Sequence, residues 1–157
     1  MVRSNNKSTH LGARLYFTPT DTTVGFVSQD ASKIDRAKRR LPNKHYIRTV
    51  DSLATLKRLS RVPQAHKNRL RRAQRTTFIF PNFRSFRLVR GTPHNLLLNR
   101  IGWLYSSSAN ESGKEYSPHY AKRQAEVLVS IPPSLREEQD APSAIYRLSF
   151  RNQIRIR

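Results

Sequence analysis

Short apolar runs alternate with polar segments along the chain, and their lengths predict a mixture of strands and helices. Several runs combine β-branched, aromatic and aliphatic residues between turn-forming residues, which is typical of strands. Eight strands are predicted on this basis, at residues 13–17, 45–50, 76–81, 85–90, 103–106, 127–131, 144–150 and 153–157.

Five further segments have the spacing or the start signals of helices. Asp30 can cap the first, which runs to about residue 40. Asp51 or Ser52 can cap the second, and the others are expected near residues 63–73, 93–102 and 118–126. Several connections are too short for the crossover that joins parallel strands, so the pattern favours an α/β domain with a mixed sheet.

The length of 157 residues fits one domain, predicted to span 1–157 with a flexible N-terminus at 1–12 and a mobile loop at 132–142. No apolar stretch reaches 18 residues, so no contact with a membrane is expected. The N-terminus lacks the apolar core of a secretory signal, and the absence of cysteine excludes disulfides and thiolate chemistry. These observations predict a cytoplasmic protein.

Charge adds a candidate class of partner. The chain has 30 Lys and Arg against 10 Asp and Glu, a net charge of +20, and no acidic residue lies between Ser52 and Asn110. A field of this sign attracts polyanions and makes their binding dependent on salt. The partner is then RNA or a phosphate-rich ligand, whereas the plain alternative is a solvated surface from a very basic proteome. Charge does not distinguish between these.

Common catalytic signatures are absent from the sequence. Neither a P-loop nor the glycine fingerprint of dinucleotide-binding folds occurs, and no serine nucleophile motif is present. The five histidines are scattered without metal-ligand spacing, so the metal ligands, if any, are unknown.

Three polar loops remain as candidate binding segments: "TPTDTTVG" (18–25), "KRRLPNK" (38–44) and "SSSANESG" (106–113). The first offers hydroxyls and a carboxylate, the second offers cations that can hold a triphosphate, and the third offers hydroxyls and an amide. Each also has a plain interpretation, as a turn, a solvated helix end and a linker. Because α/β folds bind ligands at strand ends, the three together indicate a pocket.

In order and chemistry these segments resemble the YrdC-like threonylcarbamoyl-adenylate synthase family. That family has a Y-P-T-[DE]-T-x-x-G loop, then K-x-R, an [ST]-x-S-A-N-x-S-G loop after a hydrophobic strand, and P-S-T-I near its end. The counterparts here are "TPTDTTVG", "KRR" (38–40), "SSSANESG" and "PSAI" (142–145). The segment "RGTPH" matches the family's R-V-P-x-H through Arg90 and His94. The resemblance is collinear from about Leu15 to Arg157.

The resemblance implies a single YrdC-like α/β domain, a twisted mixed β-sheet with flanking helices around a concave basic cavity. It implies a nucleotidyltransferase that makes threonylcarbamoyl-AMP and pyrophosphate from L-threonine, bicarbonate and ATP. Its product would serve the tRNA threonylcarbamoyladenosine modification, together with tRNA threonylcarbamoyl-transferase complex proteins. Mg²⁺ is expected with the ATP.

The resemblance also assigns roles to individual residues. Lys38 and Arg40 match the K-x-R pair at the triphosphate and are the candidate catalytic residues, and Thr20 and Ser108 would bind threonine. The other expected ATP contacts are Lys44, Thr77, Asn110, Ser143 and Arg157, with possible support from Asp21, Arg90 and His94. A threonine carbamate attacks the α-phosphate directly, so these residues would act by positioning and electrostatic stabilisation.

One departure from the family pattern concerns the loop before the strand at 76–81. The family has P-G-P-x-T there, whereas this chain has "AQRTT" (73–77), which retains only Thr77. A non-catalytic paralogue that binds tRNA or double-stranded RNA through its basic surface is therefore the alternative. A ribosome-associated basic protein would account for the charge but for none of the motifs.

Overall fold

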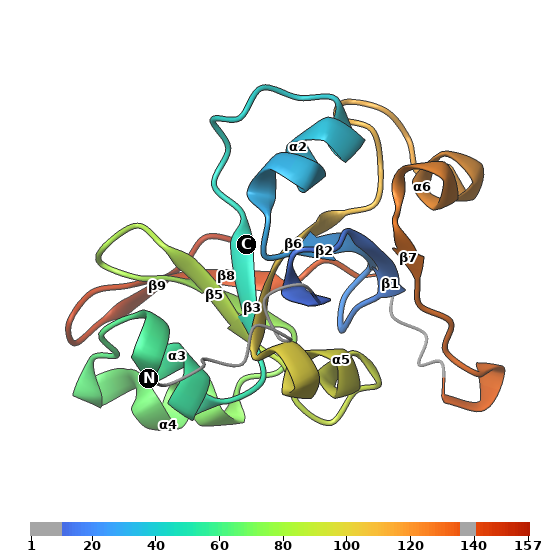
Figure 1. The fold of residues 1–157 in the computed structure, drawn as a ribbon. Coiled ribbons are helices and arrows are strands. Elements are labelled where there is room, and N and C mark those ends of the chain that lie inside the picture. The colour runs from blue at the N-terminus through green and yellow to red at the C-terminus, as the bar shows by residue number, and fades with distance from the viewer. Residues whose placement is uncertain (1–10, 136–140) are drawn as a thin grey trace, which may run out of the picture.

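In the computed structural model, which describes residues 11–135 and 141–157, nine strands form one mixed sheet (Figure 1). Their order across the sheet is β7–β1–β2–β6–β3–β5–β4–β8–β9. The strands are β1 Tyr16–Pro19, β2 Val24–Ser28, β3 Ile47–Val50, β4 Thr76–Ile79, β5 Ser85–Leu88, β6 Trp103–Ser108, β7 Val127–Leu128, β8 Ala144–Leu148 and β9 Gln153–Arg155.

The pairing combines antiparallel and parallel neighbours, as the short connections predict. β6 pairs antiparallel with β2 on one side and with β3 on the other. The parallel pairs are β1 with β7, β3 with β5 and β4 with β8. The sheet is therefore continuous from one half of the described chain to the other, with β6 as the link.

Helices cover both faces of the sheet. They are α2 Ala31–Lys38, α3 Leu53–Leu59, α4 Lys67–Arg72, α5 His94–Ile101 and α6 Pro118–Gln124, with short 3₁₀ turns η1 Gln64–His66 and η2 Pro133–Leu135. Phe26 packs in one cluster with Ile34 of α2, whereas the next residue, Val27, packs with Leu98 of α5. Successive strand residues point to opposite faces, so α2 and α5 lie on opposite sides of β2 (Figure 1).

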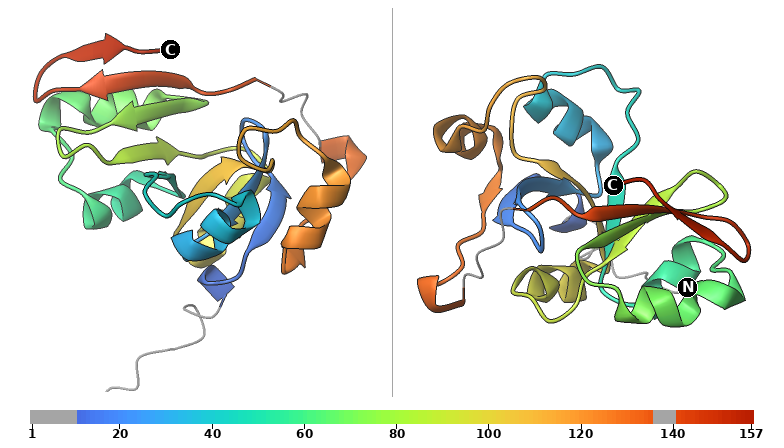
Figure 2. Two further views of the ribbon diagram at one scale, coloured as in Figure 1. Left: turned by 90° about the horizontal axis from the view of Figure 1, so that it is seen from above. Right: turned by 180° about the vertical axis from the view of Figure 1, so that it is seen from behind.

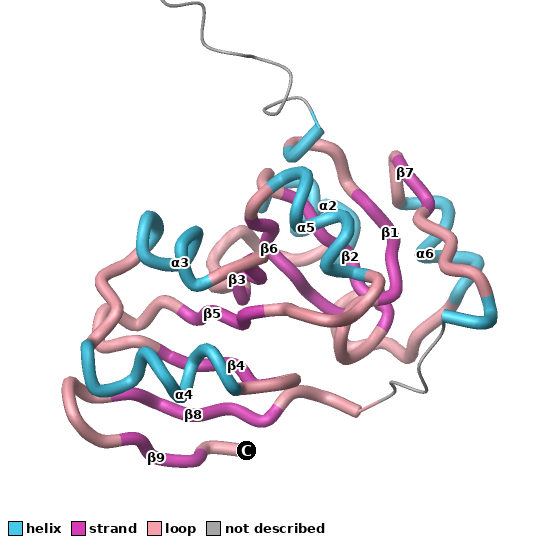
Figure 3. The backbone as a smooth tube through the Cα atoms, turned by 90° about the horizontal axis from the view of Figure 1, so that it is seen from below, coloured by secondary structure: helices cyan, strands magenta, loops and turns pink. Residues whose placement is uncertain are grey.

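The second half of the sheet has a core of its own. Leu56 of α3 and Leu70 of α4 pack against Phe78, Phe86 and Leu148 of β4, β5 and β8. Figure 2 shows these two helices at the far end of the molecule from α6, and Figure 3 shows them beside β5, β4 and β8. The two halves thus leave the polar ends of the central strands between them.

The eight strands and five helices predicted from the sequence are all present, with bounds that agree to within a few residues. The ninth strand, β2, was not predicted. The capping predictions are confirmed where Asp30 accepts from Ser32 N and Ser52 accepts from Thr55 N. The segment before α4 forms η1, so this helix begins at Lys67 and not at Pro63. Most of the predicted flexible N-terminus, residues 1–10, and the middle of the predicted mobile loop, residues 136–140, lie outside the described residues, while η2 lies within the first part of that loop.

Candidate functional site

Polar side chains share one face of the central strands. Thr49 of β3 is in register with Arg87 of β5 and with Leu104 of β6. Register partners project from the same face, and Ser106 lies two residues beyond Leu104, so its side chain is on that face too. This face carries hydroxyls and a buried guanidinium at its centre, where a sheet otherwise carries apolar residues.

The hydroxyl loop between β1 and β2 folds tightly against β6. The Oγ1 of Thr20 donates a hydrogen bond to the carbonyl of Thr23, and it also receives the N–H of Thr22 at 3.2 Å. A Cβ on Gly25 would lie 2.9 Å from the carbonyl oxygen of Ser107 and 3.1 Å from Cγ2 of Thr20. Glycine at this position therefore lets the loop bring Thr20 next to the end of β6.

Lys38, the last residue of α2, is buried and directed at the end of β6. Its Nζ donates hydrogen bonds to the carbonyls of Ser108 and Asn110, both at 2.8 Å, and to Oδ1 of Asn110 at 3.1 Å. Burial, together with the charges of Arg40 and Lys44, lowers the pKa of Lys38 to about 8. A nearby anion would relieve the repulsion between these cations, so the three together favour the binding of a negatively charged ligand.

Arg40 is held in place by a pair of buried groups. Its Nε donates to the hydroxyl of Tyr46 at 2.9 Å and lies 3.8 Å from Oδ1 of Asp35. Tyr46 in turn donates to Asp35, and burial followed by this carboxylate raises the pKa of Tyr46 to about 12. Tyr46 therefore stays neutral and fixes the guanidinium two residues beyond Lys38. Lys44 is exposed beside them.

The loop after β6 is rigid, unlike a linker. The hydroxyl of Ser108 donates to Oδ1 of Asn110 at 2.6 Å, and Nδ2 of Asn110 donates to the carbonyls of Glu111 and Lys114. Ser112 N donates to the carbonyl of Lys38 at 2.9 Å, and Gly113 takes a positive φ of 76° that closes the turn. Thus Lys38, Ser108 and Asn110 form one hydrogen-bonded unit.

A second buried unit consists of the Asp21–Arg87 pair, with His94 within electrostatic range of both. The Nε of Arg87 lies 3.1 Å from Oδ1 and 3.0 Å from Oδ2 of Asp21, and both side chains are almost fully buried. His94 opens α5 and is also buried, which lowers its pKa to about 4 and keeps the ring neutral. The Asp21–Arg87 pair ties the β1–β2 loop to the centre of the sheet.

Buried polar atoms without hydrogen bonds gather at this second unit. Within the described residues they are Oδ2 of Asp21, Oγ1 of Thr92 and both ring nitrogens of His94. Asp21 and Thr92 also line a cavity of about 140 Å³, together with residues 73–75 and 88–91. Oδ2 of Asp21 is already 3.0 Å from Nε of Arg87, so the lining group left without any partner is the hydroxyl of Thr92, and a water or small polar group in the cavity would satisfy it.

A third unit links β4 with the end of the chain. The hydroxyls of Thr77 and Ser143 are buried 2.9 Å apart. Arg157 donates from Nε and NH2 to the carbonyl of Ser143, at 3.2 and 3.1 Å, and its backbone pairs with Ile145. These three residues meet although 80 residues separate the first from the last in the sequence numbering.

The loop that departs from P-G-P-x-T also departs in backbone conformation. Arg75, which stands where the family pattern has its second proline, has a φ of 49° that proline cannot adopt. Its NH2 donates to the carbonyl of Ala141, and its own carbonyl accepts from Ala144 N. The loop is therefore bound to the segment around the start of β8 by two contacts, of which the guanidinium contact is one that a proline could not make.

The structure thus brings the sequence-predicted residues together in groups. Lys38, Ser108 and Asn110 form one group, with Arg40 and Lys44 beside it, while Thr77, Ser143 and Arg157 form another. Asp21 pairs with Arg87, and His94 is buried within electrostatic range of both, but Arg90 is exposed at the rim of the small cavity.

Sequence reasoning missed the groups that hold these residues in place. Arg87, Asp35 and Tyr46 were not among the predicted site residues. The only sequence signal for Arg87 is its position between Phe86 and Leu88 in a predicted strand. Side chains alternate between the two faces of a strand, so the charge of Arg87 must lie on the face opposite to these two apolar residues and find a partner there.

Two further features bear on the chemistry. Among the described residues, no group of three His, Asp or Glu side chains is placed to hold a metal ion. Among those residues there is also no helix with the length and apolar character needed to cross a membrane.

No protein-family model matches the chain. In sequence it is similar to the uncharacterized protein MG259 of Mycoplasma genitalium, with 26% identity over 152 residues, which is 87% of this chain and 31% of that protein. The Mycoplasma pneumoniae homolog of MG259 is 27% identical over 151 residues, with the same coverage. The chain therefore spans about a third of the length of the curated relatives it matches.

Comparison with solved structures identifies the fold. The crystal structure of P. abyssi Sua5 complexed with L-threonine superimposes with a TM-score of 0.71 at 18% identity, covering 96% of this chain and 53% of that one. The solution structure of MTH1692 from Methanobacterium thermoautotrophicum gives a TM-score of 0.64 at 18% identity, covering 100% and 89%. The chain has the YrdC/Sua5 fold, which confirms the fold expected from the resemblance.

Proposed function

We propose that this domain is an L-threonylcarbamoyladenylate synthase, a nucleotidyltransferase that uses ATP, L-threonine and bicarbonate. The observation that supports it best is the hydrogen-bonded unit of Lys38, Ser108 and Asn110, with Arg40 held beside it by Tyr46. These residues belong to two of the motifs that resemble the synthase family, and the fold brings them into contact across 70 residues of sequence. The P. abyssi Sua5 structure with L-threonine supports threonine as a ligand of this fold.

The proposed reaction needs no protein nucleophile. Threonine and bicarbonate give a carbamate and water, a carbamate oxygen attacks the α-phosphorus of ATP, and the bond from that phosphorus to the bridging oxygen breaks to release pyrophosphate. Negative charge then builds up on the phosphate oxygens and on the leaving group. Lys38, Arg40 and Lys44 are positioned to stabilise that charge, which is the main contribution expected of an enzyme for this step.

The remaining groups would bind the two ends of the substrates. Thr20 and Ser108 would offer their hydroxyls to threonine near Lys38. Thr77, Ser143 and Arg157 would contact the nucleotide. Mg²⁺ would arrive as the ATP complex and thus as part of the substrate.

The experiment that tests the proposal measures products directly. Purified protein is incubated with ATP, Mg²⁺, L-threonine and bicarbonate, and threonylcarbamoyl-AMP and pyrophosphate are measured by mass spectrometry and a coupled assay. We expect Ser108→Ala and Lys38→Ala to lower kcat/KM at least about a hundredfold, in the range found when a transition-state donor is removed. Lys122→Ala, on the exposed face of α6, is the charge-matched control and should retain activity.

Absence of threonine-dependent pyrophosphate from a folded sample would contradict the proposal. It would then favour the second candidate, a non-catalytic paralogue that binds tRNA or double-stranded RNA through its basic surface. That candidate is supported by the exposed Lys and Arg residues of α3 and α4, which have no carboxylate partner within the described residues. It predicts RNA binding that Lys38→Ala and Ser108→Ala leave unchanged.

We propose in addition that the product is passed to tRNA threonylcarbamoyl-transferase proteins in the cytoplasm. The support is the resemblance, together with the positive charge that would favour proximity to tRNA. A pull-down of such proteins with and without tRNA tests the partnership.

A further inference from the structure

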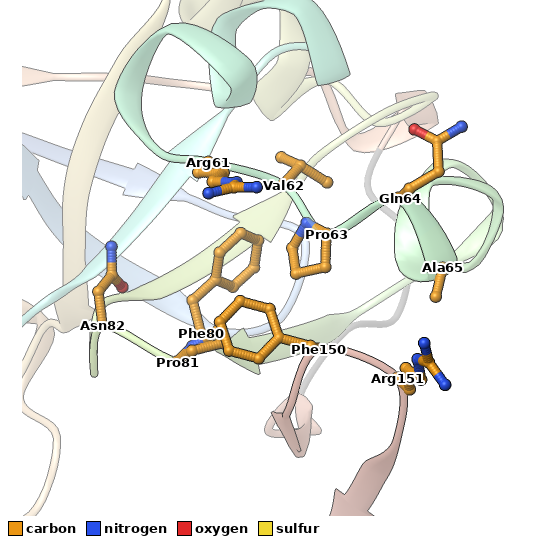
Figure 4. A pocket seen from close by; sticks show the side chains of 10 residues that line it. All are labelled: Arg61, Val62, Pro63, Gln64, Ala65, Phe80, Pro81, Asn82, Phe150 and Arg151. Carbon is orange, nitrogen blue, oxygen red and sulfur yellow. The ribbon is translucent and has the colours of Figure 1, made fainter.

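A hollow of about 630 Å³ lies away from the three polar units of the site. It is formed where η1, the β4–β5 turn and the β8–β9 turn meet (Figure 4). β4 and β8 are parallel neighbours, and each is followed by a turn that leads into an antiparallel strand. Both turns therefore lie at the same end of the two strands. The volume is within the range of pockets that bind small organic groups.

Hydrogen bonds hold the segments around the hollow together. His66 of η1 is fully buried, and its Nε2 lies 2.8 Å from the carbonyl of Ser149, which fastens η1 to the β8–β9 turn. Ser149 N donates to the carbonyl of Asn152 at 2.8 Å, and Asn152 N donates to Oγ of Ser149 at 3.0 Å. Phe150 and Arg151, the two residues between them, are thus presented by a closed turn.

Aromatic and proline rings line the hollow. Phe80, Phe150 and Pro63 all line the hollow, and their rings are labelled in Figure 4. Phe80 is buried in the core, but Phe150 is 69% exposed at the rim. An exposed aromatic ring above an apolar floor is the arrangement on which nucleic-acid bases stack.

The charges around the hollow are of one sign. Both charged lining residues are arginines, Arg61 and Arg151, and both are exposed. Lys57 and Arg58 of α3 and Arg84 in the β4–β5 turn are also exposed on the segments that lead to the lining residues, and within the described residues none of these five cations forms an ion pair. Such a rim attracts phosphates and would repel a basic peptide or a second copy of this chain.

We propose that this hollow binds an unpaired nucleotide of single-stranded RNA, with its base against Phe150 and the flanking phosphates on Arg61 and Arg151. Gln64 distinguishes RNA from DNA in this arrangement. Gln64 is a lining residue, its exposed side-chain amide is directed outward from the two rings (Figure 4), and this amide has no hydrogen-bond partner among the described residues. It offers both a donor and an acceptor, which matches the 2′-hydroxyl of ribose. The inference does not depend on the synthase proposal, because it uses other residues.

The first test measures binding by fluorescence anisotropy with a labelled 12-nucleotide oligouridylate, its DNA counterpart and an RNA duplex. The full chain should bind the single-stranded RNA most tightly, and the DNA about threefold more weakly for the loss of one hydrogen bond. Phe150→Ala should weaken RNA binding about tenfold through the lost stacking. Phe83→Ala is the matched control, since Phe83 is 79% exposed in the β4–β5 turn but is not itself a lining residue, and it should change affinity less than about twofold.

The second test separates phosphate contacts from general charge. Arg61→Gln and Arg151→Gln should each reduce the slope of log affinity against log salt by about 0.7, the value for one phosphate of a single strand. Arg123→Gln, on the exposed face of α6, removes the same charge elsewhere and should leave the slope nearly unchanged. Phe150→Ala should also leave pyrophosphate release unchanged, so a failure of this proposal is distinguishable from a failure of the synthase proposal.

Several results would overturn the inference. They are equal losses for Phe150→Ala and Phe83→Ala, equal affinity for duplex and single strand, or equal affinity for DNA and RNA. Self-association of the chain in sedimentation experiments that disappears in Phe150→Ala would show that a second copy occupies the hollow. Thermal unfolding of each variant checks that it is folded, and crosslinking of 4-thiouridine RNA to residues 149–152 gives an independent readout of position.

Discussion

The side chain of Lys38 is buried, and burial disfavours the charged form of a lysine. Two carbonyls and the Asn110 side chain surround its ammonium group, while burial, Arg40 and Lys44 lower its pKa to about 8. The protonated form is therefore present below pH 8 and is lost as pH rises through that value. An ATP phosphate placed among these cations would favour the protonated form and raise the pKa.

ATP binding should accordingly take up protons at Lys38. At pH 8 we expect an uptake of about half a proton per ATP, and at pH 6.5 none from this residue, with affinity falling as pH rises above 8. Calorimetry in two buffers with different ionisation enthalpies measures the uptake. Lys38→Met should abolish the difference between the two pH values, whereas Lys122→Met should keep it. The same uptake in Lys38→Met would assign the titration to another group.

The candidate site residues that lie within the family motifs could be proposed from the sequence. The residues that hold those side chains in position could not. Lys38, Ser108 and Asn110 could be predicted because the chemistry of their loops is visible in consecutive residues. Arg87 could not, because its partner Asp21 is 66 residues away and only the folded sheet brings the two together. Asp35 and Tyr46 lie closer in sequence, but their pairing depends on how the segment after α2 returns to the sheet.

Strand β2 shows at the level of elements why short patterns mislead. The stretch before it is a turn of threonines, and the strand itself includes a glycine, which is unfavourable in strands, so the loop predicted at 18–25 includes its first two residues and the pattern predicts no strand for the other three. In the structure Gly25 is opposite Ser108, and its lack of a side chain makes room for Thr20 and for the carbonyl of Ser107. Gly25 therefore weakens the strand pattern in the sequence, and it also allows the loop with Thr20 to pack against the end of β6.

Gly25→Ala should consequently disturb both the β2–β6 pairing and the Thr20 loop. The new Cβ would lie 2.9 Å from a backbone oxygen, so we expect the free energy of unfolding to fall by about 1–3 kcal/mol, measured by urea denaturation. Gly91→Ala is the comparison, since a Cβ there meets nothing within 4 Å and only its φ of 70° is unfavourable. It should cost about 1 kcal/mol. A Gly25→Ala protein as stable as the wild type would show that the sheet adapts.

Charge is distributed unevenly over the whole molecule. The ion pairs of the described residues lie around α2, α6 and the site, and none of them involves α3, α4 or the β8–β9 turn. The half of the sheet beneath those helices therefore carries much of the net charge of +20 without local compensation. Sequence counting could predict the excess, but only the fold shows that it gathers at one end.

Salt should therefore stabilise the folded chain. Raising NaCl from 10 to 100 mM shortens the screening length from about 30 to about 10 Å and should raise the free energy of unfolding by on the order of 1 kcal/mol. Urea denaturation at the two concentrations measures this, with sucrose of equal osmolality as the control. Lower stability at higher salt would mean that the few ion pairs outweigh the repulsion.

The position of β6 between β2 and β3 also sets the order in which the chain can assemble. The β1–β2 hairpin and the β3–β5–β4 strands precede β6 in the sequence, yet they share no edge with one another. During synthesis from the N-terminus, both groups emerge before residues 103–108 are available to join them. The sheet therefore closes late, around a strand made after its neighbours, and until then both groups expose an open edge to the cell's chaperones.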